Sequence, residues 1–183
     1  MLRKLFIHCL AAVPLAGGAS LAHAQSGQQA ALEAGGQLVA SAVVWGIISY
    51  TRWPQPPQPL RLCIIGNSTH GDALYRPSDW FGPERSVTVH GAVTEQEAVS
   101  QCDVLYVGKL PPERLTALVK ALTGKPVLTI GEERDFCSFG GMFCLEGAAG
   151  SVRFAANLDA ISRSGLRVNP QVLRLSRQLP NRP

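Results

Sequence analysis

The chain has 183 residues, 46% of them hydrophobic, and a formal net charge of +4 from 17 basic and 13 acidic side chains. Its basic residues are scattered, without the run of Lys and Arg interleaved with aromatic residues that indicates a nucleic-acid-binding face. The length suits one domain with a sizeable core, since domains have roughly 100–200 residues.

The N-terminus has the three zones of an export signal. Arg3 and Lys4 supply a basic start, an apolar stretch follows, and Ala22-His23-Ala24 is a cleavage pattern. The apolar stretch is too short to span a bilayer, which needs about 20 residues. We expect residues 1–24 to be a cleaved signal peptide and residues 25–183 to be a single domain. Loss of the basic pair lowers the net charge to about +2.

The first element expected after the signal is a long helix from about Glu33 to Arg52. Apolar residues occupy most of its faces, as in a helix that is buried on most sides or packs on a partner chain. Trp53-Pro54 ends it. Four prolines between positions 54 and 59 then predict an extended connector.

Strand and helix patterns alternate over the next stretch of about 70 residues. Apolar runs predict strands at 60–66, 85–90, 103–108 and 126–131. Helices are expected between them, at 69–74, 94–101 and 111–122, and Thr94 with Glu97 forms a capping-box pattern. This alternation predicts an α/β fold with a mostly parallel sheet, helices on both faces and the doubly wound strand order 2-1-3.

The pattern changes after residue 131. Met142–Glu146 and Ser151–Ala156 are expected to be the strands of a hairpin, because a Gly-Ala-Ala-Gly segment separates them. Asn157 is the N-cap of a helix expected to end near Ser164, and a last helix is expected at Pro170–Gln178. The domain is thus predicted to end with a hairpin and two helices.

Four cysteines remain after the export signal: Cys63, Cys102, Cys137 and Cys144. An even number in an exported chain indicates two disulfides, with three possible pairings. Zinc is the competing interpretation, but the C-x-x-C spacing and adjacent histidines of zinc sites are absent. We favour Cys63–Cys102, because strand order 2-1-3 makes their strands neighbours, and Cys137–Cys144, because a turn-rich segment separates them. The other two pairings stay open on sequence grounds.

Motifs for catalysis or for binding a cofactor are weak. Residues 66–71 (Gly-Asn-Ser-Thr-His-Gly) follow a strand as ligand-binding loops do, but they lack the dinucleotide and P-loop patterns and are interpreted as a turn. His70 could pair with an aspartate, yet no nucleophile is placed by pattern, Ser68 being only a weak candidate. Glu132, Glu133 and Asp135 are interpreted as a solvated loop. We therefore predict no catalytic, cofactor-binding or metal-binding residues.

The unusual feature is an apolar, glycine-rich loop between the last two cysteines. Phe139, Met142 and Phe143 lie in it. Because loops usually run over the surface, such side chains either tuck into the core or contact a partner. Both alternatives are open from the sequence.

The segments together resemble the YfiR family. The resemblance rests on Arg61–Gly66, Asp103–Val107 and Val127–Gly131, on the loop ending Gly-Gly-Met-Phe-Cys at Cys144, and on Tyr50–Pro54. It covers nearly the whole chain after the signal. The resemblance implies an α/β fold, a homodimer and the same two disulfides that we favour.

The resemblance also implies a regulator that has no catalytic activity and resides in the periplasm. YfiR-like proteins bind the periplasmic part of the inner-membrane diguanylate cyclase YfiN and hold it inactive, and the outer-membrane lipoprotein YfiB sequesters them. Release raises cyclic-di-GMP and biofilm formation. We expect partner contacts at Phe139, Met142, Phe143, Ile161 and Arg163. A periplasmic small-ligand-binding protein is the main alternative, and a periplasmic enzyme of unknown class is a third.

Overall fold

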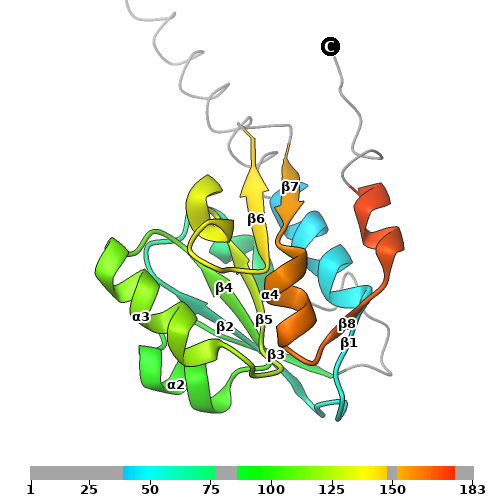
Figure 1. Cartoon of the computed structure of the whole chain (residues 1–183), viewed down its shortest axis with the longest axis horizontal. Helices are drawn as coiled ribbons and strands as arrows, with labels where there is room; N and C mark the ends of the chain where they lie inside the picture. The colour runs from blue at the N-terminus through cyan, green and yellow to red at the C-terminus, as the bar shows by residue number, and fades with distance from the viewer. Residues whose placement is uncertain (1–38, 77–85, 148–151, 176–183) are drawn as a thin grey trace, which may run out of the picture.

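A computed structural model describes residues 39–76, 86–147 and 152–175. The expected signal peptide, the start of the first helix and the hairpin turn lie outside these ranges. Figure 1 shows a twisted sheet with helices packed against it. The sheet has six strands in the order β3-β2-β4-β5-β6-β7. In chain order they are β2 (Leu60–Ile65), β3 (Val87–His90), β4 (Val104–Val107), β5 (Leu128–Gly131), β6 (Phe143–Glu146) and β7 (Arg153–Ala156).

All neighbouring strands are parallel except β6 and β7, which form the expected antiparallel hairpin. Every residue of β4 and β5 is buried, which is the pattern of strands covered on both faces. The first three strands of the large sheet lie in the order 2-1-3, because β2 is flanked by β3 and β4. The predicted α/β fold and its strand order are confirmed.

Helices cover both faces of the sheet, and each face has its own core. On one face the helix at 39–49 contributes Trp45 and Ile48, and α4 (Leu158–Arg163) contributes Ala160. On the other face α2 (Glu95–Gln101) and α3 (Pro112–Leu122) pack their apolar sides against the sheet. The capping box of α2 is present as predicted. Within the described ranges, every helix is too short or too polar to span a lipid bilayer.

The structure differs from the prediction at both ends of the domain. The first helix stops at 49 rather than 52, and β1 (Thr51–Arg52) pairs antiparallel with β8 (Arg167–Val168) in a second, two-stranded sheet. The hydroxyl of Thr51 donates to the Ile47 carbonyl at 2.8 Å and so satisfies one of the last carbonyls of the helix. Three short elements are 3-10 helices: η1 (Gly71–Tyr75), η3 (Arg134–Cys137) and η4 (Pro170–Arg174). The predicted helices at 69–74 and from 170 thus take this tighter form.

Both disulfides form with the favoured pairing. Cys63 bonds Cys102 across a Cα–Cα distance of 5.9 Å, and Cys137 bonds Cys144 across 5.6 Å. Among the described residues, no group of His, Cys, Asp and Glu side chains is arranged to hold a metal ion.

Candidate recognition surface

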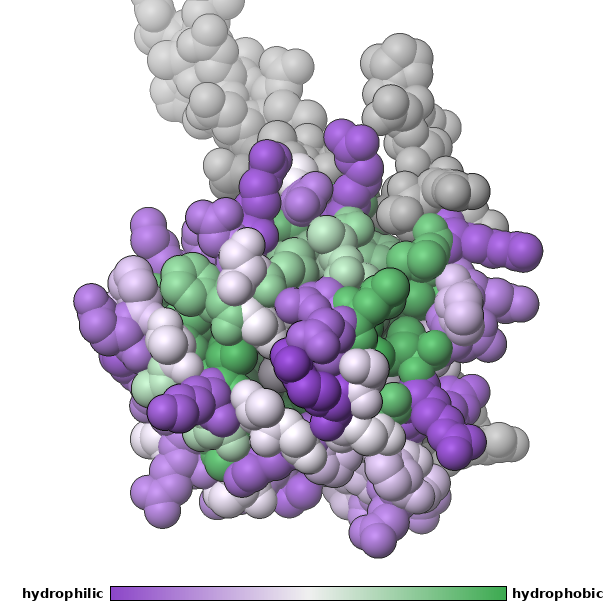
Figure 2. All heavy atoms as spheres, viewed as in Figure 1, coloured by the Kyte–Doolittle hydropathy of each residue, from purple (hydrophilic) through white to green (hydrophobic). Residues whose placement is uncertain are grey.

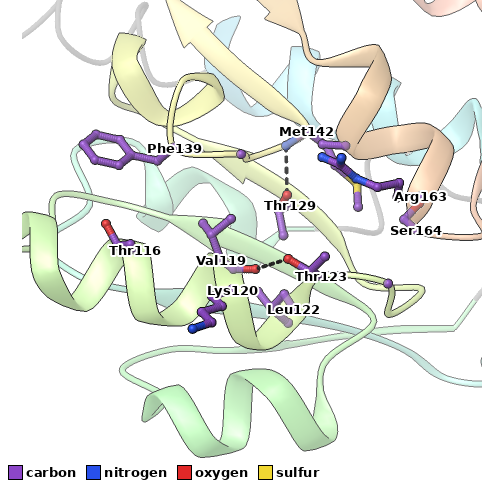
Figure 3. A pocket seen from close by; sticks show the side chains of 13 residues that line it. Thr116, Val119, Lys120, Leu122, Thr123, Thr129, Phe139, Met142, Arg163 and Ser164 are labelled. Carbon is purple, nitrogen blue, oxygen red and sulfur yellow. Dashed lines mark hydrogen bonds between the residues drawn. The ribbon is translucent and has the colours of Figure 1, made fainter.

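A cavity of about 290 Å³ lies between α3, the loop closed by Cys137–Cys144 and α4 (Figure 3). Each of these three elements supplies one wall. The lining includes apolar side chains such as Val119, Phe139 and Met142, and hydroxyls such as those of Thr123, Thr129 and Ser164. Its positive charge comes from Lys120 and Arg163. The cavity can therefore accommodate an apolar group next to a negatively charged one.

Two glycines give the disulfide-closed loop its shape: Gly141 leaves room for an aromatic ring beneath it, and Gly140 takes a conformation that favours glycine. Phe136 is buried, and its ring occupies the space that a side chain on Gly141 would need. Gly140 has a φ of +102°, a conformation that favours glycine. The amide of Gly141 donates to the Phe136 carbonyl at 3.0 Å, which closes the turn. Phe136 anchors the loop from below, and Phe139 is left on its outer side.

The three large apolar residues of this loop have different environments. Phe143 has no exposed surface, and its ring meets the edge of Phe154 at a centroid distance of 5.8 Å. Met142 is 6% exposed, and its amide donates to the Thr129 hydroxyl at 3.0 Å. Phe139 is 41% exposed. Two of the three thus lie in the core, and one lies on the surface.

The helix α4 is tied directly to the loop. The side chain of Asn157 accepts a hydrogen bond from the Ala160 amide at 3.0 Å and donates one to the Cys137 carbonyl at 3.0 Å. The same residue therefore caps α4, as predicted, and holds its first turn against the disulfide. This contact sets the distance between two walls of the cavity.

The two predicted contacts in α4 lie on different sides of that helix. Ile161 is partly buried against the core. Arg163 has a side chain that is 58% exposed, forms an ion pair with Asp159 one turn earlier and extends toward the cavity in Figure 3. Figure 2 shows hydrophobic side chains gathered over α4, η4 and the helix at 39–49. Leu158 and Leu173 are the most exposed of the large hydrophobic residues here, at 72% and 50%.

The structure thus brings Phe139, Met142 and Arg163 to one cavity, while Phe143 lies beneath the surface and Ile161 packs against the core. The sequence interpretation missed the wall formed by α3. Its residues Val119, Lys120 and Thr123 belong to an ordinary amphipathic helix, and no pattern in the chain marks them as facing the loop. They reach the cavity only because α3 packs its leucines on this face of the sheet, beside the loop.

Glu132 is not part of a solvated acidic loop, contrary to the prediction from the sequence. Its carboxylate is half-buried and accepts hydrogen bonds from the Ser68 hydroxyl at 2.7 Å and the Tyr106 hydroxyl at 3.0 Å. Burial, and secondarily the nearby carboxylate, raise the pKa of Tyr106, so its hydroxyl keeps the proton that it donates. The Glu132 carboxylate is thus hydrogen-bonded to the turn at 66–71, which precedes it by more than 60 positions in the chain.

A second cavity, of about 300 Å³, lies beside the small β1–β8 sheet. Arg52 and Arg167 line it, together with Tyr50 and Pro170. The sequence interpretation did not identify this cavity, because its two arginines are far apart in the chain and meet only through the pairing of β1 with β8. Its positive charge suits a small anion.

The fold and the surface together define a small disulfide-bonded α/β protein that has a cavity between a loop and two helices. A family model described as YfiR/HmsC-like matches residues 37–177. The chain therefore belongs to the YfiR/HmsC-like family. Membership implies YfiR-type regulation, and the family consists of regulatory proteins that are not known as enzymes.

Proposed function

We propose that this protein is a periplasmic repressor of an inner-membrane diguanylate cyclase of the YfiN type. It binds the periplasmic part of the cyclase, lowers cyclic-di-GMP and biofilm formation, and is itself sequestered by an outer-membrane lipoprotein of the YfiB type. Family membership supports this proposal. The observation that carries the site is that two exposed side chains, Phe139 and Arg163, line one cavity from different elements, the disulfide loop and α4.

Repression of this kind needs a surface that distinguishes two states of the partner. A binding protein shifts an equilibrium only by its difference in affinity for the two states. Phe139 offers an aromatic anchor, and Arg163 with Lys120 offers positive charge at the cavity. We infer that the partner inserts an apolar side chain flanked by a carboxylate.

The buried residues among the predicted contacts keep an indirect role in this proposal, because they hold the disulfide loop and α4 in position. They are Met142, Phe143 and Ile161. The side chains of Met142 and Phe143 fix the end of the disulfide loop in the core, and Ile161 packs α4 against the same core. Truncating them would displace the loop or the helix, and partner affinity would fall by that route. Direct contact is assigned to Phe139 and Arg163, whose side chains are exposed.

The remaining parts of the proposal concern export and assembly. We propose that residues 1–24 are removed on export, that residues 25–183 form one domain in the periplasm, and that the domain forms a homodimer. Two disulfides support an oxidising compartment, since such bonds persist there and are rare in the cytosol. Mass spectrometry of periplasmic extracts tests the cleavage after Ala24.

The deciding experiment is deletion of the gene followed by measurement of cyclic-di-GMP and surface attachment. Both are expected to rise, and the wild-type gene is expected to reverse the rise. Phe139→Ala should fail to reverse it, although the variant folds normally. Tyr75→Ala is the matched control, because Tyr75 is an aromatic residue of similar exposure that does not line the cavity. Unchanged cyclic-di-GMP in the deletion strain would contradict the proposal.

The cavity beside β1 and β8 favours a second function, the binding of a small anionic ligand. Arg52 and Arg167 supply the charge, and Tyr50 supplies an aromatic wall. Calorimetry of the purified protein with small carboxylates and phosphates tests this function, with Arg167→Ala as the variant. Two results together would favour this function over repression. The purified protein would bind the anion only when Arg167 is present, and deletion of the gene would leave cyclic-di-GMP unchanged.

A further inference from the structure

Doubly wound sheets bind their ligands in the crevice outside the carboxyl ends of the strands, where the strand order reverses. In this protein the reversal lies at β2, which has β3 on one side and β4 on the other. The turn at 66–71 follows β2, and Glu132 follows β5 directly. The side chain of Glu132 therefore belongs to the edge of the sheet where a ligand would be expected.

Four donors converge on the two oxygens of this carboxylate. The Ser68 hydroxyl (2.7 Å), the His70 amide (2.8 Å) and the Tyr106 hydroxyl (3.0 Å) donate to Oε1, and the Thr69 amide (2.8 Å) donates to Oε2. The Ser68 oxygen in turn accepts from the Gly71 amide at 2.8 Å. Hydrogen bonds to a carboxylate are stronger than those between neutral groups. The turn after β2 is thus arranged around an anion that the chain itself provides.

The same residue begins the segment that carries the candidate recognition surface. The amide of Glu132 donates to the Val107 carbonyl at 2.9 Å, so its backbone is held at the end of β4. Two residues later η3 begins, and η3 ends at Cys137, the first cysteine of the loop. The side chain and backbone of Glu132 therefore join the turn after β2 to the base of the loop that presents Phe139.

We propose that Glu132 is a positioning residue for partner recognition, whose carboxylate fills the ligand crevice of the fold and holds the disulfide-closed loop in place. This inference rests on the function proposed above. It predicts that a free carboxylate can replace the one that is lost in Glu132→Ala. The atoms removed by this substitution correspond to acetate, and the four donors are supplied by other residues.

Three variants of the full mature chain test the inference. Glu132→Ala removes the carboxylate, Glu132→Gln keeps its shape but sets an NH₂ group against amide donors, and Glu133→Ala is the exposed neighbouring control. Amide hydrogen exchange measures local order at Thr69 and His70 in the turn after β2, and at Phe139 in the disulfide-closed loop. Affinity for the full-length cyclase in detergent reports recognition.

We expect Glu132→Ala to raise exchange at Thr69 and His70 by about tenfold or more, and to weaken cyclase binding by a similar factor. Glu132→Gln should fall between Glu132→Ala and the wild type, and Glu133→Ala should match the wild type. Added acetate should restore both readouts of Glu132→Ala in part, whereas chloride at equal ionic strength should not. Rescue of this kind separates lost positioning from general unfolding.

Wild-type affinity in Glu132→Ala would overturn the inference, as would loop exchange that acetate leaves unchanged. If the wild-type protein itself does not bind the cyclase, the proposed function fails, and the exchange data still decide whether Glu132 positions the loop. Increased exchange confined to Thr69 and His70, with none at Phe139, would show that the carboxylate orders only the turn and would also overturn the positioning role.

Discussion

The two disulfides cross-link regions that differ in burial and in sequence separation. Cys63–Cys102 spans 39 positions, and both residues lie in the core between the sheet and α2 and α3, where they are 2% and 5% exposed. Cys137–Cys144 spans 7 positions and encloses Phe139, which is 41% exposed. The first bridge ties the central strand β2 to the C-terminal end of α2, just before β4, and the second closes one surface loop.

The difference teaches that the same covalent bond can act on the whole fold or on one surface loop, depending on what it encloses. A cross-link stabilises chiefly by restricting the unfolded chain, and the effect grows with the length of the closed loop. The long bridge therefore acts on the whole domain. The short bridge acts on a segment whose base is held by Phe136 and by Glu132, and whose tip presents Phe139.

Removal of the long bridge is expected to have the largest effect. Cys63→Ala with Cys102→Ala should lower the free energy of unfolding by about 4 kcal/mol, because a long loop of the unfolded chain is released. Urea denaturation of the mature protein measures this change. A loss no greater than that caused by opening the short bridge would contradict the comparison.

Compared with removal of the long bridge, removal of the short bridge should lower the free energy of unfolding less and the affinity for the cyclase more. Cys137→Ala with Cys144→Ala is expected to lower the free energy of unfolding by about 2.5 kcal/mol. Hydrogen exchange should rise within the loop from 137 to 144, and affinity for the cyclase should fall further than in the variant without the long bridge, compared at a temperature where both are folded. Equal losses of affinity in the two variants would show that the short bridge has no special role in recognition.

The helix α2 has Cys102, a residue of the long bridge, as its C-cap. The N-cap of this helix therefore shows how much a local contact stabilises the region that the long bridge already holds. Thr94→Ala removes the hydroxyl that accepts from the Glu97 amide, and we expect a loss of about 1 kcal/mol in the free energy of unfolding. Ser100→Ala, on the same helix, is the control and should change stability by less than about 0.5 kcal/mol. Thermal melts of the two variants measure the difference. Equal shifts would mean that the capping box adds little to a helix already anchored at Cys102.

The smallest expected effect is a pH dependence at the same cap. The Thr94 amide, and then its hydroxyl, donate to Glu97 and lower the pKa of that carboxyl. The unfolded chain therefore takes up the proton first as pH falls. The stabilisation is fully present above the ordinary Glu pKa of about 4.3 and is lost as pH falls through the lowered folded value. The stability difference between wild type and Glu97→Gln should shrink over that range, and a difference independent of pH would contradict this origin.

Much of the fold follows from local patterns. The apolar runs at β4 and β5 predicted buried parallel strands, and Thr94 and Asn157 predicted the starts of α2 and α4. These features depend on residues close together in the chain, where periodicity and capping chemistry act. The Cys63–Cys102 pairing could also be predicted, because it followed from the strand order that these local patterns implied.

The candidate site was only partly predictable. The sequence marked Phe139, Met142 and Phe143 as unusual, but it left open which of them faces the core. Burial of Met142 and Phe143 depends on Thr129 and Phe154, which belong to other strands. The role of Glu132 was missed, because three of its donors lie more than 60 positions earlier in the chain.

The sequence by itself determined the class of fold, the central strands and the elements that alternate with them, because hydrophobic periodicity and helix caps act over a few neighbouring residues. Tertiary structure alone decided the cavity between α3 and α4, the exposure of Phe139, the pairing of β1 with β8 and the contacts of Glu132. Each of these joins residues far apart in the chain, and their side chains meet only after the sheet has brought its strands into register.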